Sequence, residues 1–332
     1  MNSQSLRRTM AGCCSTIVLL ASTSGSAVAD PAAPPVEFAQ GEKHLTVAID
    51  GLPVATYCFK DEKIKRTYFA HVRAPSGVQV TRHHPPIEGR DLMDHDTFHP
   101  GIWMSFGDIS GSDYWRNMAR VEHVEFVQEP EGQPGVGTFA VRNRYLAQSD
   151  PSQIVCEELC HFTILVRPAG YLLRWDSRFS HDKEFYFGDQ EEMGLGFRVA
   201  TPLRVAANGD GGVPPGNGTI RDSEARTNES EIWGNTADWC DYRGEMAGHR
   251  VGMAIFCHPD NFRPSWFHAR DYGLLEANPF GRQAFGKGEP SKVLIKPGKR
   301  MRLRYGVLIH SGPRGTSPDL QAAYADYLTV AD

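Results

Sequence analysis

Histidine residues are concentrated in the segment from Arg82 to Trp115, which contains four of the 13 histidines of the chain. His95 lies between two aspartates, and His99 follows four positions later. Proline and glycine interrupt the segment, which predicts loops, and loops on a rigid scaffold carry many binding residues. Imidazole and carboxylate groups can transfer protons near neutral pH or bind a divalent metal. We therefore expect His95 and His99 to be acid/base residues, and they are also the candidate ligands for a divalent metal.

Two further polar groups could complete such a site. Glu192 ends an acidic run that precedes a predicted strand, and it could serve as the partner acid or base; a charged turn is the alternative. His268 and Arg270 lie in a predicted strand, where alternation places them on one face. An arginine there can bind a carboxylate or a sugar hydroxyl. We expect His268 to join the catalytic set and Arg270 to orient the substrate.

Aromatic residues accompany these polar groups along the chain. Carbohydrates present C–H faces that pack on aromatic rings and hydroxyls that take hydrogen bonds. Packing in the core is the alternative for each ring. The candidate substrate-binding residues are Trp103, Asp108, Trp115, Asp189, Trp239, Asp241, Arg270, Asp271 and Tyr272.

The segments that must position these residues are short and mostly strand-like. Alternating apolar and polar residues bounded by glycine, proline and asparagine predict strands. Only residues 317–332 show the apolar spacing of a helix. We expect an all-β fold, a large antiparallel β-sandwich with one C-terminal helix. The predicted strands include residues 44–49, 54–59, 121–128, 138–146, 154–166, 171–180, 194–199, 249–256, 266–270, 292–295 and 301–310.

The N-terminus resembles a secretory signal sequence. Arg7 and Arg8 precede a short apolar stretch, and Ala27-Val28-Ala29 fits the small-residue cleavage rule. We expect residues 1–29 to be a signal peptide cleaved after Ala29, with a retained N-terminal anchor as the alternative. Residues 30–43 are expected to be a flexible leader, and residues 44–332 a single domain. No later segment has the ~18 consecutive apolar residues of a membrane span. The expected location is therefore periplasmic or secreted.

Composition and motifs exclude several function classes. The 332 residues carry 35 Lys+Arg and 40 Asp+Glu, for a net charge of −5, which does not favour nucleic acid. There is no glycine-rich phosphate loop, no GxSxG elbow and no dinucleotide fingerprint. The expected partner is a small-molecule or oligosaccharide substrate. The cysteines after the cleavage point are odd in number and widely spaced, which favours buried core thiols; a single disulfide between two of them is the alternative. These cysteines are Cys58, Cys156, Cys160, Cys240 and Cys257.

An ordered set of motifs between Thr46 and Tyr327 resembles the PmoA-like family, a domain of unknown function that carries the label methane oxygenase PmoA. The motifs are Val80-Thr81-Arg82, Asp94-His95 before Gly101-Ile102-Trp103, Gly107-Asp108 before Asp113-Tyr114-Trp115, Gly188-Asp189 before Glu192, Trp239-Cys240-Asp241-Tyr242, His268 before Arg270-Asp271-Tyr272-Gly273, and Asn278-Pro279-Phe280-Gly281.

The resemblance implies an exported bacterial protein that works beside carbohydrate-degrading enzymes. It also implies the supersandwich fold of galactose mutarotase-like proteins. The family motif points to His95, His99, Glu192, His268, Arg270 and Asp271. In one place the chain departs from the family pattern: Asp96-Thr97-Phe98-His99 stands where the family has adjacent histidines and an arginine. This departure weakens the case for a metal at this position.

Three function classes follow from these residues. The first is an exported carbohydrate-active enzyme, a glycoside hydrolase, lyase or sugar epimerase, with His and Glu as acid and base. The second is a carbohydrate-binding protein that uses the same aromatic residues and arginine without catalysis. The least favoured is a metal-dependent oxygenase, as the family label would have it. A membrane-bound methane oxygenase subunit needs transmembrane helices, which the sequence lacks.

Overall fold

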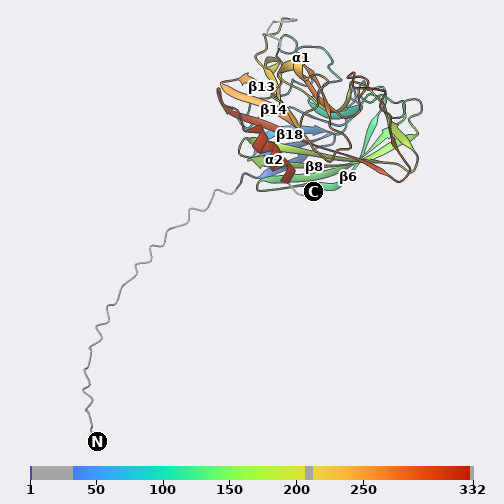
Figure 1. The fold of residues 1–332 in the computed structure, drawn as a ribbon, viewed down its shortest axis with the longest axis horizontal. Helices are drawn as coiled ribbons and strands as arrows, with labels where there is room; N and C mark the ends of the chain where they lie inside the picture. Colours follow the sequence, from blue (N-terminus) through green and yellow to red (C-terminus); the bar gives the residue numbers. More distant parts are fainter. Residues whose placement is uncertain (2–32, 206–211, 330–332) are drawn as a thin grey trace. The chain divides into compact units, whose positions relative to one another are not determined.

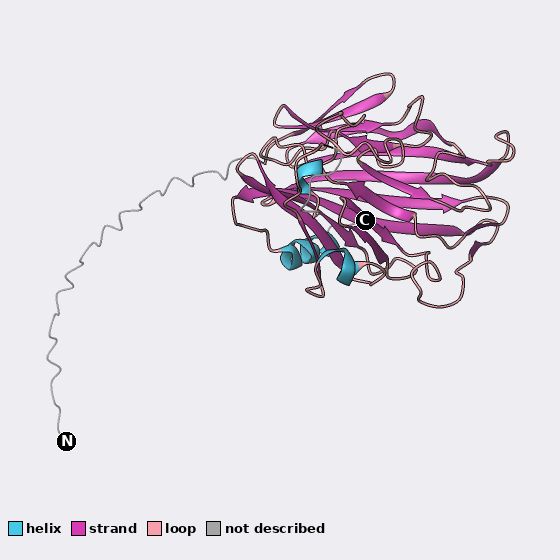
Figure 2. Ribbon diagram, turned by 90° about the horizontal axis from the view of Figure 1, so that it is seen from above, coloured by secondary structure: helices cyan, strands magenta, loops and turns pink. Residues whose placement is uncertain are grey.

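Two antiparallel sheets of eight strands each dominate the protein (Figures 1 and 2). The computed structural model describes residue 1, residues 33–205 and residues 212–329. The predicted signal peptide therefore lies outside the described residues, apart from Met1. The expectation of a large antiparallel β-sandwich with a C-terminal helix is confirmed.

The first sheet carries the candidate site. Its strand order is β1-β2-β3-β4-β5-β11-β16-β15. In that order the strands are Val36–Gln40, His44–Ile49, Leu52–Cys58, Tyr68–Ala70, Ile102–Phe106, Met193–Arg198, Leu274–Asn278 and Trp266–Arg270.

The second sheet has the order β12-β13-β14-β18-β9-β8-β7-β6. Its strands are Thr219–Asp222, Trp239–Met246, His249–Cys257, Arg300–Pro313, Gly170–Ser180, Ile154–Arg167, Val136–Leu146 and Val121–Gln133. The remaining elements are the strand pair β10 (Phe185–Phe187) and β17 (Val293–Ile295), the 3₁₀ turn η1 (Thr201–Leu203), and the helices α1 (Asn228–Ile232) and α2 (Leu320–Thr329).

The main core lies between the two sheets. Alternation along β5 sends Ile102, Met104 and Phe106 into this core, while Trp103 joins a separate, smaller cluster on the other side of the sheet. Aromatic contacts join the two layers: the Phe106 ring lies 5.4 Å from that of Phe179 on β9. The first sheet therefore has one face in the core and one face free to carry polar chemistry. We call the second of these the outer face of the first sheet.

Parts of the described chain differ from the expected boundaries. Val36–Gln40 forms β1 and pairs with β2, so the ordered sandwich includes part of the predicted leader. Helix α2 starts at Leu320, where the N–H of Ala322 bonds to the Asp319 carboxylate at 3.0 Å. Among the described residues, no helix is long and apolar enough to cross a membrane. The five cysteines of the described chain are free, and four of them are buried, as the apolar context predicted.

Candidate functional site

Four neighbouring strands place polar side chains in register on the outer face of the first sheet. Trp103 on β5 pairs with Gly196 on β11, Gly196 with Glu276 on β16, and Glu276 with His268 on β15. Because neighbouring strands lie about 4.8 Å apart, this row spans roughly 14 Å. In the next row Arg198 and Arg270 flank Leu274. Residues distant in sequence thus form one floor.

His95 and His99 lie beside this floor in a single helical turn. The N–H of His99 donates to the carbonyl of His95 at 3.0 Å, and the two rings stack with centroids 4.8 Å apart. The His99 ring also lies flat on Trp103, at 5.2 Å and an interplanar angle of 7°. The proline and glycine after His99 stop the helix after this one turn. The spacing of four residues therefore brings the two imidazoles together, as a helix would.

Buried arginines hold the loop that carries the two histidines. Arg82 donates to the carbonyls of Leu92 at 2.8 Å, Asp94 at 2.5 Å and His95 at 3.0 Å. Arg66 donates to the carbonyl of Phe98 at 2.5 Å and to backbone carbonyls of residues 114–115. Hydrogen bonds from a charged donor are stronger than neutral ones. These contacts attach an irregular loop to the sheet and so fix the imidazole positions.

Arg198 sets the charge state of the loop. It binds the Asp94 carboxylate through two nitrogens, at 2.9 and 3.0 Å, and its Nη1 lies 3.1 Å from Nδ1 of His99. Because a guanidinium always donates, His99 must accept at Nδ1 and carry its proton on Nε2. Burial lowers the pKa of His99 well below its ordinary value, and the charge of Arg198 adds to this. His99 is therefore a neutral imidazole at neutral pH.

Asp94 and His95 form a hydrogen-bonded pair at the exposed side of the loop. The Nδ1 atom of His95 lies 2.7 Å from Oδ2 of Asp94. Burial works to raise the pKa of Asp94, but the hydrogen bond to His95 and the charge of Arg198 together hold it well below its usual range. The carboxylate is thus ionised and orients the ring. The side chain of His95 is 45% exposed, which leaves Nε2 accessible to a ligand.

Tyr272 stands between the histidine loop and the carboxylates on the other side of the floor. The Arg198 guanidinium carbon lies 4.5 Å from the centroid of its ring. Burial raises the pKa of Tyr272 to about 12, with smaller opposing effects from Arg198 and Arg270 and smaller raising effects from Asp94 and Glu192. The phenol therefore keeps its proton. The charged groups that act on its pKa lie on both sides of the floor, so Tyr272 occupies the centre of the site.

Glu192 belongs to an ion-paired group at the end of β11. Its carboxylate forms a close ion pair with Arg116, and its side chain is 27% exposed. Arg116 also binds the Asp113 carboxylate at 2.9 Å and the Gln190 side chain at 3.3 Å. Glu192 is therefore an oriented and accessible carboxylate.

Arg270 is surrounded by acceptors. It donates to Nε2 of His268 at 2.9 Å, to Glu229 at 2.8 Å and to Glu191 at 2.6 Å. Glu191 also accepts from the Trp233 indole at 2.7 Å. His268 is almost fully buried, and burial, with the charge of Arg270, lowers its pKa to about 3. This imidazole is neutral as well.

The structure brings nine of the predicted residues to this face or its border. Trp103 and Trp115 are fully buried, with ring centroids 5.4 Å apart, and they pack together within the floor. Asp271 accepts from the N–H of Glu229 at 2.9 Å and so holds the short helix α1. The nine residues are His95, His99, Trp103, Trp115, Glu192, His268, Arg270, Asp271 and Tyr272.

Four predicted residues lie elsewhere or serve the backbone. Trp239 and Asp241 are on β13 of the second sheet, and Asp241 is buried against His310 at 2.9 Å. Asp189 accepts from three backbone N–H groups of residues 283–291 and so ties down that loop. Asp108 accepts from the N–H of Gly111 at 2.7 Å within a turn. Sequence order alone could not distinguish these residues from those on the site face.

The fold adds several residues to the site that were not predicted from the sequence. Arg198, Glu276 and Glu229 complete the contacts of the predicted residues, and Arg116 holds Glu192. One signal was visible: Glu276 is the single charged residue of the strand Leu274–Asn278. A charge at a buried strand position needs a partner, and its alternation with Leu275 and Ala277 places it on the face opposite the core.

The geometry gives limited support to a metal at His95 and His99. Within the described ranges, no group of three or more His, Cys, Asp or Glu side chains could hold a metal ion. The Nδ1 atoms of the two histidines are also engaged, by Asp94 and Arg198.

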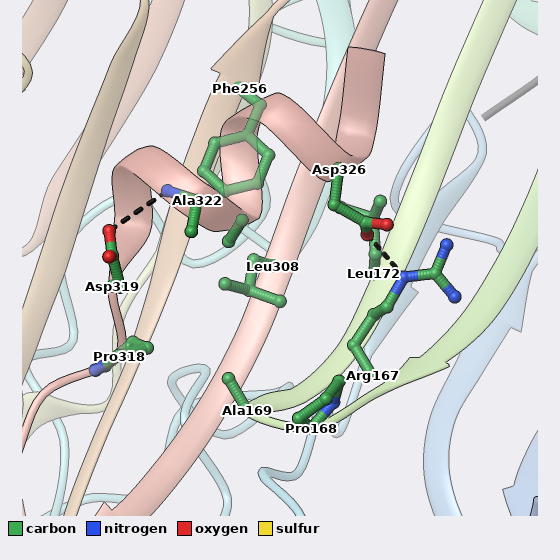
Figure 3. Close-up of a pocket in the computed structure, with 11 residues that line it drawn as sticks. Arg167, Pro168, Ala169, Leu172, Phe256, Leu308, Pro318, Asp319, Ala322 and Asp326 are labelled. Atoms are coloured by element: carbon green, nitrogen blue, oxygen red, sulfur yellow. Dashed lines mark hydrogen bonds and ion pairs between the residues drawn. The ribbon is translucent and has the colours of Figure 1, made fainter. Parts of the chain in front are cut away.

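A separate pocket of about 530 Å³ lies between α2 and the second sheet (Figure 3). Leu172, Leu308 and Phe256 form its apolar side, and an Arg167–Asp326 ion pair closes one edge. None of the predicted site residues lines it. The outer face of the first sheet therefore remains the candidate site, because the acid/base groups are there.

The sequence places the chain in a family. A model of a family of unknown function, DUF6807, matches residues 44–325, so the chain belongs to that family. The expected PmoA-like membership is wrong, because no PmoA family model matches. The oxygenase hypothesis thereby loses its basis. No curated protein matches the chain.

The fold is similar to that of solved carbohydrate-related proteins. A galactose mutarotase-like protein from Lactobacillus casei shares 10% identity and a TM-score of 0.38, covering 83% of this chain and 100% of its own. The GH36 alpha-galactosidase AgaB from Geobacillus stearothermophilus shares 10% identity and a TM-score of 0.39, covering 84% of this chain and 41% of its own. Because these TM-scores lie below 0.5, the function is argued from the chain's own residues.

Proposed function

We propose that the protein is a carbohydrate-active enzyme that transfers protons on an uncharged sugar or glycoside at the outer face of the first sheet. The observation that carries the proposal is the Asp94–His95 pair, 2.7 Å apart, at the accessible side of that face. A carboxylate that holds Nδ1 of an imidazole fixes its tautomer and leaves Nε2 free for acid/base work. Reactions that cleave or epimerise sugars need such a group.

The remaining residues supply complementary roles. Glu192 is the second acid/base group, because its carboxylate is oriented by Arg116 and accessible. His99 presents a neutral Nε2–H, which can stabilise an oxygen that gains negative charge without transferring its proton. The Tyr272 hydroxyl and Arg270 can hydrogen-bond sugar hydroxyls. Proton abstraction, as in epimerisation or elimination, fits a carboxylate base beside a neutral imidazole donor.

The test is turnover of a panel of neutral sugars and aryl glycosides, followed by proton NMR in D₂O. Deuterium incorporation reports proton abstraction, and new anomeric signals report cleavage. His95→Gln and Glu192→Gln should each lower the rate at least 100-fold with an unchanged Tm. Glu129→Gln, at an exposed position of β6, is the matched control and should retain full activity. Equal activity of all four proteins would refute the proposed roles.

One observation favours a second function, binding of carbohydrate without turnover. The carboxylates Glu191, Glu192 and Glu229 each contact an arginine, and such pairs can orient donors for binding alone. In that case a glycan bound by the wild type should also bind to His95→Gln and Glu192→Gln with similar affinity, and no product should form. Calorimetric titration beside the NMR assay separates the two functions.

Export is part of the proposal. The signal-like N-terminus described above supports it. N-terminal sequencing of protein recovered from the periplasm and the medium should give Asp30 as the first residue. Intact Met1 in protein found only in the cytoplasm would contradict export.

A further inference from the structure

Arg270 has three of its five N–H donors occupied. A guanidinium carries one N–H on Nε and two on each Nη. Nε donates to His268, one Nη1 hydrogen to Glu229 and one Nη2 hydrogen to Glu191. Two N–H groups, one on each terminal nitrogen, are left among the described contacts. Such a parallel pair of donors can bind two neighbouring oxygen atoms of one ligand.

The contact with Arg270 shows which tautomer His268 adopts. Nε of an arginine always bears hydrogen, so Nε2 of His268 must accept and the imidazole proton must sit on Nδ1. Nδ1 faces the Glu276 carboxyl, 3.3 Å from Oε2. In the alternative tautomer, Nε2–H would donate to Glu191 over the longer distance of 3.5 Å. Its hydrogen would then lie against the Nε–H hydrogen of Arg270, and the two would repel each other. The order of donation is therefore Arg270 to His268 to Glu276.

Glu276 is the last member of this chain, and among the described residues it has no ion pair with a lysine or an arginine. The residue is fully buried, and its Oε1 atom has no hydrogen-bond partner in the described part of the chain. Arg116, the arginine whose charge acts on Glu276, is already bound by Asp113 and Glu192. Burial raises the pKa of Glu276 well above its ordinary value, the charges of Glu192 and Glu191 add to this, and the N–H of Met193 and Arg116 act in the opposite direction.

We propose that Glu276 is an uncharged carboxylic acid that acts as a positioning residue: it holds the Nδ1–H tautomer of His268, so that Nε2 fixes Arg270 with two N–H donors available to a pair of adjacent hydroxyls on an uncharged sugar. An ionised Glu276 would favour an imidazolium at His268, which would repel Arg270 and remove its acceptor. The buried acid therefore determines the position of the partly exposed Arg270.

The charges around Arg270 select the ligand class. Glu191 and Glu229 both contact its guanidinium, so this cluster carries one excess negative charge. A uronate or sulfate would meet that excess, whereas hydroxyls can accept from the two N–H groups without a charge penalty. This part of the inference rests on the proposed function, because it names the ligand of the same site.

Spectroscopy of the free protein tests the positioning chain without any substrate. At pH 7 the infrared difference spectrum, wild type minus Glu276→Gln, should contain the C=O band of a protonated buried carboxyl; the subtraction removes any band of Glu158, a second buried carboxyl. The ¹⁵N NMR signals of His268, assigned by comparison with His268→Gln, should show the proton on Nδ1. Glu276→Gln should keep this tautomer, because its amide oxygen accepts the same hydrogen bond, whereas Glu276→Leu should change it.

Contrary results would overturn the chain. These are a difference spectrum, wild type minus Glu276→Gln, without the C=O band, or a His268 signal with the proton on Nε2 or on both nitrogens. The wild type and His268→Gln suffice for the tautomer if the Glu276 variants do not fold. Glu129→Gln serves as the control for the infrared band. Because no turnover is measured, these results stand apart from the loss or survival of activity in His95→Gln.

Calorimetric titration with a neutral methyl glycoside and with glucuronate tests the ligand class. The neutral glycoside should bind, and Arg270→Lys should weaken it at least tenfold, because lysine cannot present the paired donors. Tighter binding of glucuronate, or no effect of Arg270→Lys, would overturn the assignment of a neutral diol. Unchanged spectroscopic results would then leave the positioning chain intact.

Discussion

Gly196 and Trp103 face each other across β11 and β5, and a Cβ atom built on Gly196 would lie 3.4 Å from Cζ2 of Trp103 and 3.3 Å from Cβ of Glu276. The missing side chain keeps the middle of the floor low between the His99–Trp103 stack and the His268–Glu276 pair. The glycine therefore shapes the site, although it carries no chemistry.

Substitutions at Gly196 should show this steric limit. Gly196→Ala meets neighbours at close but tolerable distances, whereas Gly196→Val adds two methyl groups and should destabilise the fold by about 1–3 kcal/mol. Urea unfolding of the two variants measures the difference. Equal stability of the Ala and Val variants would mean that the neighbouring side chains move freely.

Acid should destabilise the protein partly through His268. Its pKa is lowered to about 3 in the fold, from an ordinary 6.5 in the unfolded chain. Between these values the unfolded chain binds a proton that the folded chain does not, so its contribution is present above pH 6.5 and is lost as the pH falls toward 3. His268→Gln should therefore flatten the fall in stability, by up to about 1.4 kcal/mol per pH unit between pH 6 and pH 4. Chemical denaturation at several pH values measures the slope.

The exposed His249 on β14 provides the control for that experiment. His249→Gln should reproduce the wild-type curve. A His268→Gln curve that also follows the wild type would show that His268 is not buried in its neutral form.

Glu276 should have the opposite effect on stability. Its pKa is raised in the fold, so above an ordinary carboxyl value near 4.5 the unfolded chain releases a proton that the folded chain keeps. The stability contribution is complete below that pH and declines as the pH rises. Glu276→Gln removes the ionisation and should be more stable than the wild type at pH 7 and above, and close to it at pH 4. Thermal unfolding across this range tests the sign, with Glu129→Gln as the control.

Arg82 should be essential for the histidine loop. Arg82→Met leaves the carbonyls of Leu92, Asp94 and His95 without their donor and should cost about 3 kcal/mol. Arg73→Met removes a single bond from an exposed arginine to the carbonyl of Gly77 and should cost about 0.5 kcal/mol or less. Urea unfolding compares the two. Similar small losses in both variants would contradict the supporting role of Arg82.

The strand pattern was predictable because it depends on local alternation. The segments at 44–49, 154–166, 171–180 and 266–270 agree closely with β2, β8, β9 and β15. Short central strands such as β5 and β16 were missed, because both of their faces are buried and they show no alternation. Missing β16 also concealed Glu276, whereas Arg198 lay in a predicted strand whose partners the sequence could not give.

The sequence by itself determined the fold class, the buried cysteines, and a set of His, Glu and Arg residues suited to proton transfer on a polar ligand. Only the tertiary structure decided which of them meet. Strand order places β11 between β5 and β16, and this joins His99, Arg198, Glu276 and His268 across more than 170 residues while leaving Trp239 and Asp241 on the other sheet. The physical reason is that register and burial, which set these contacts and protonation states, arise from pairing between distant strands, and local composition does not encode that pairing.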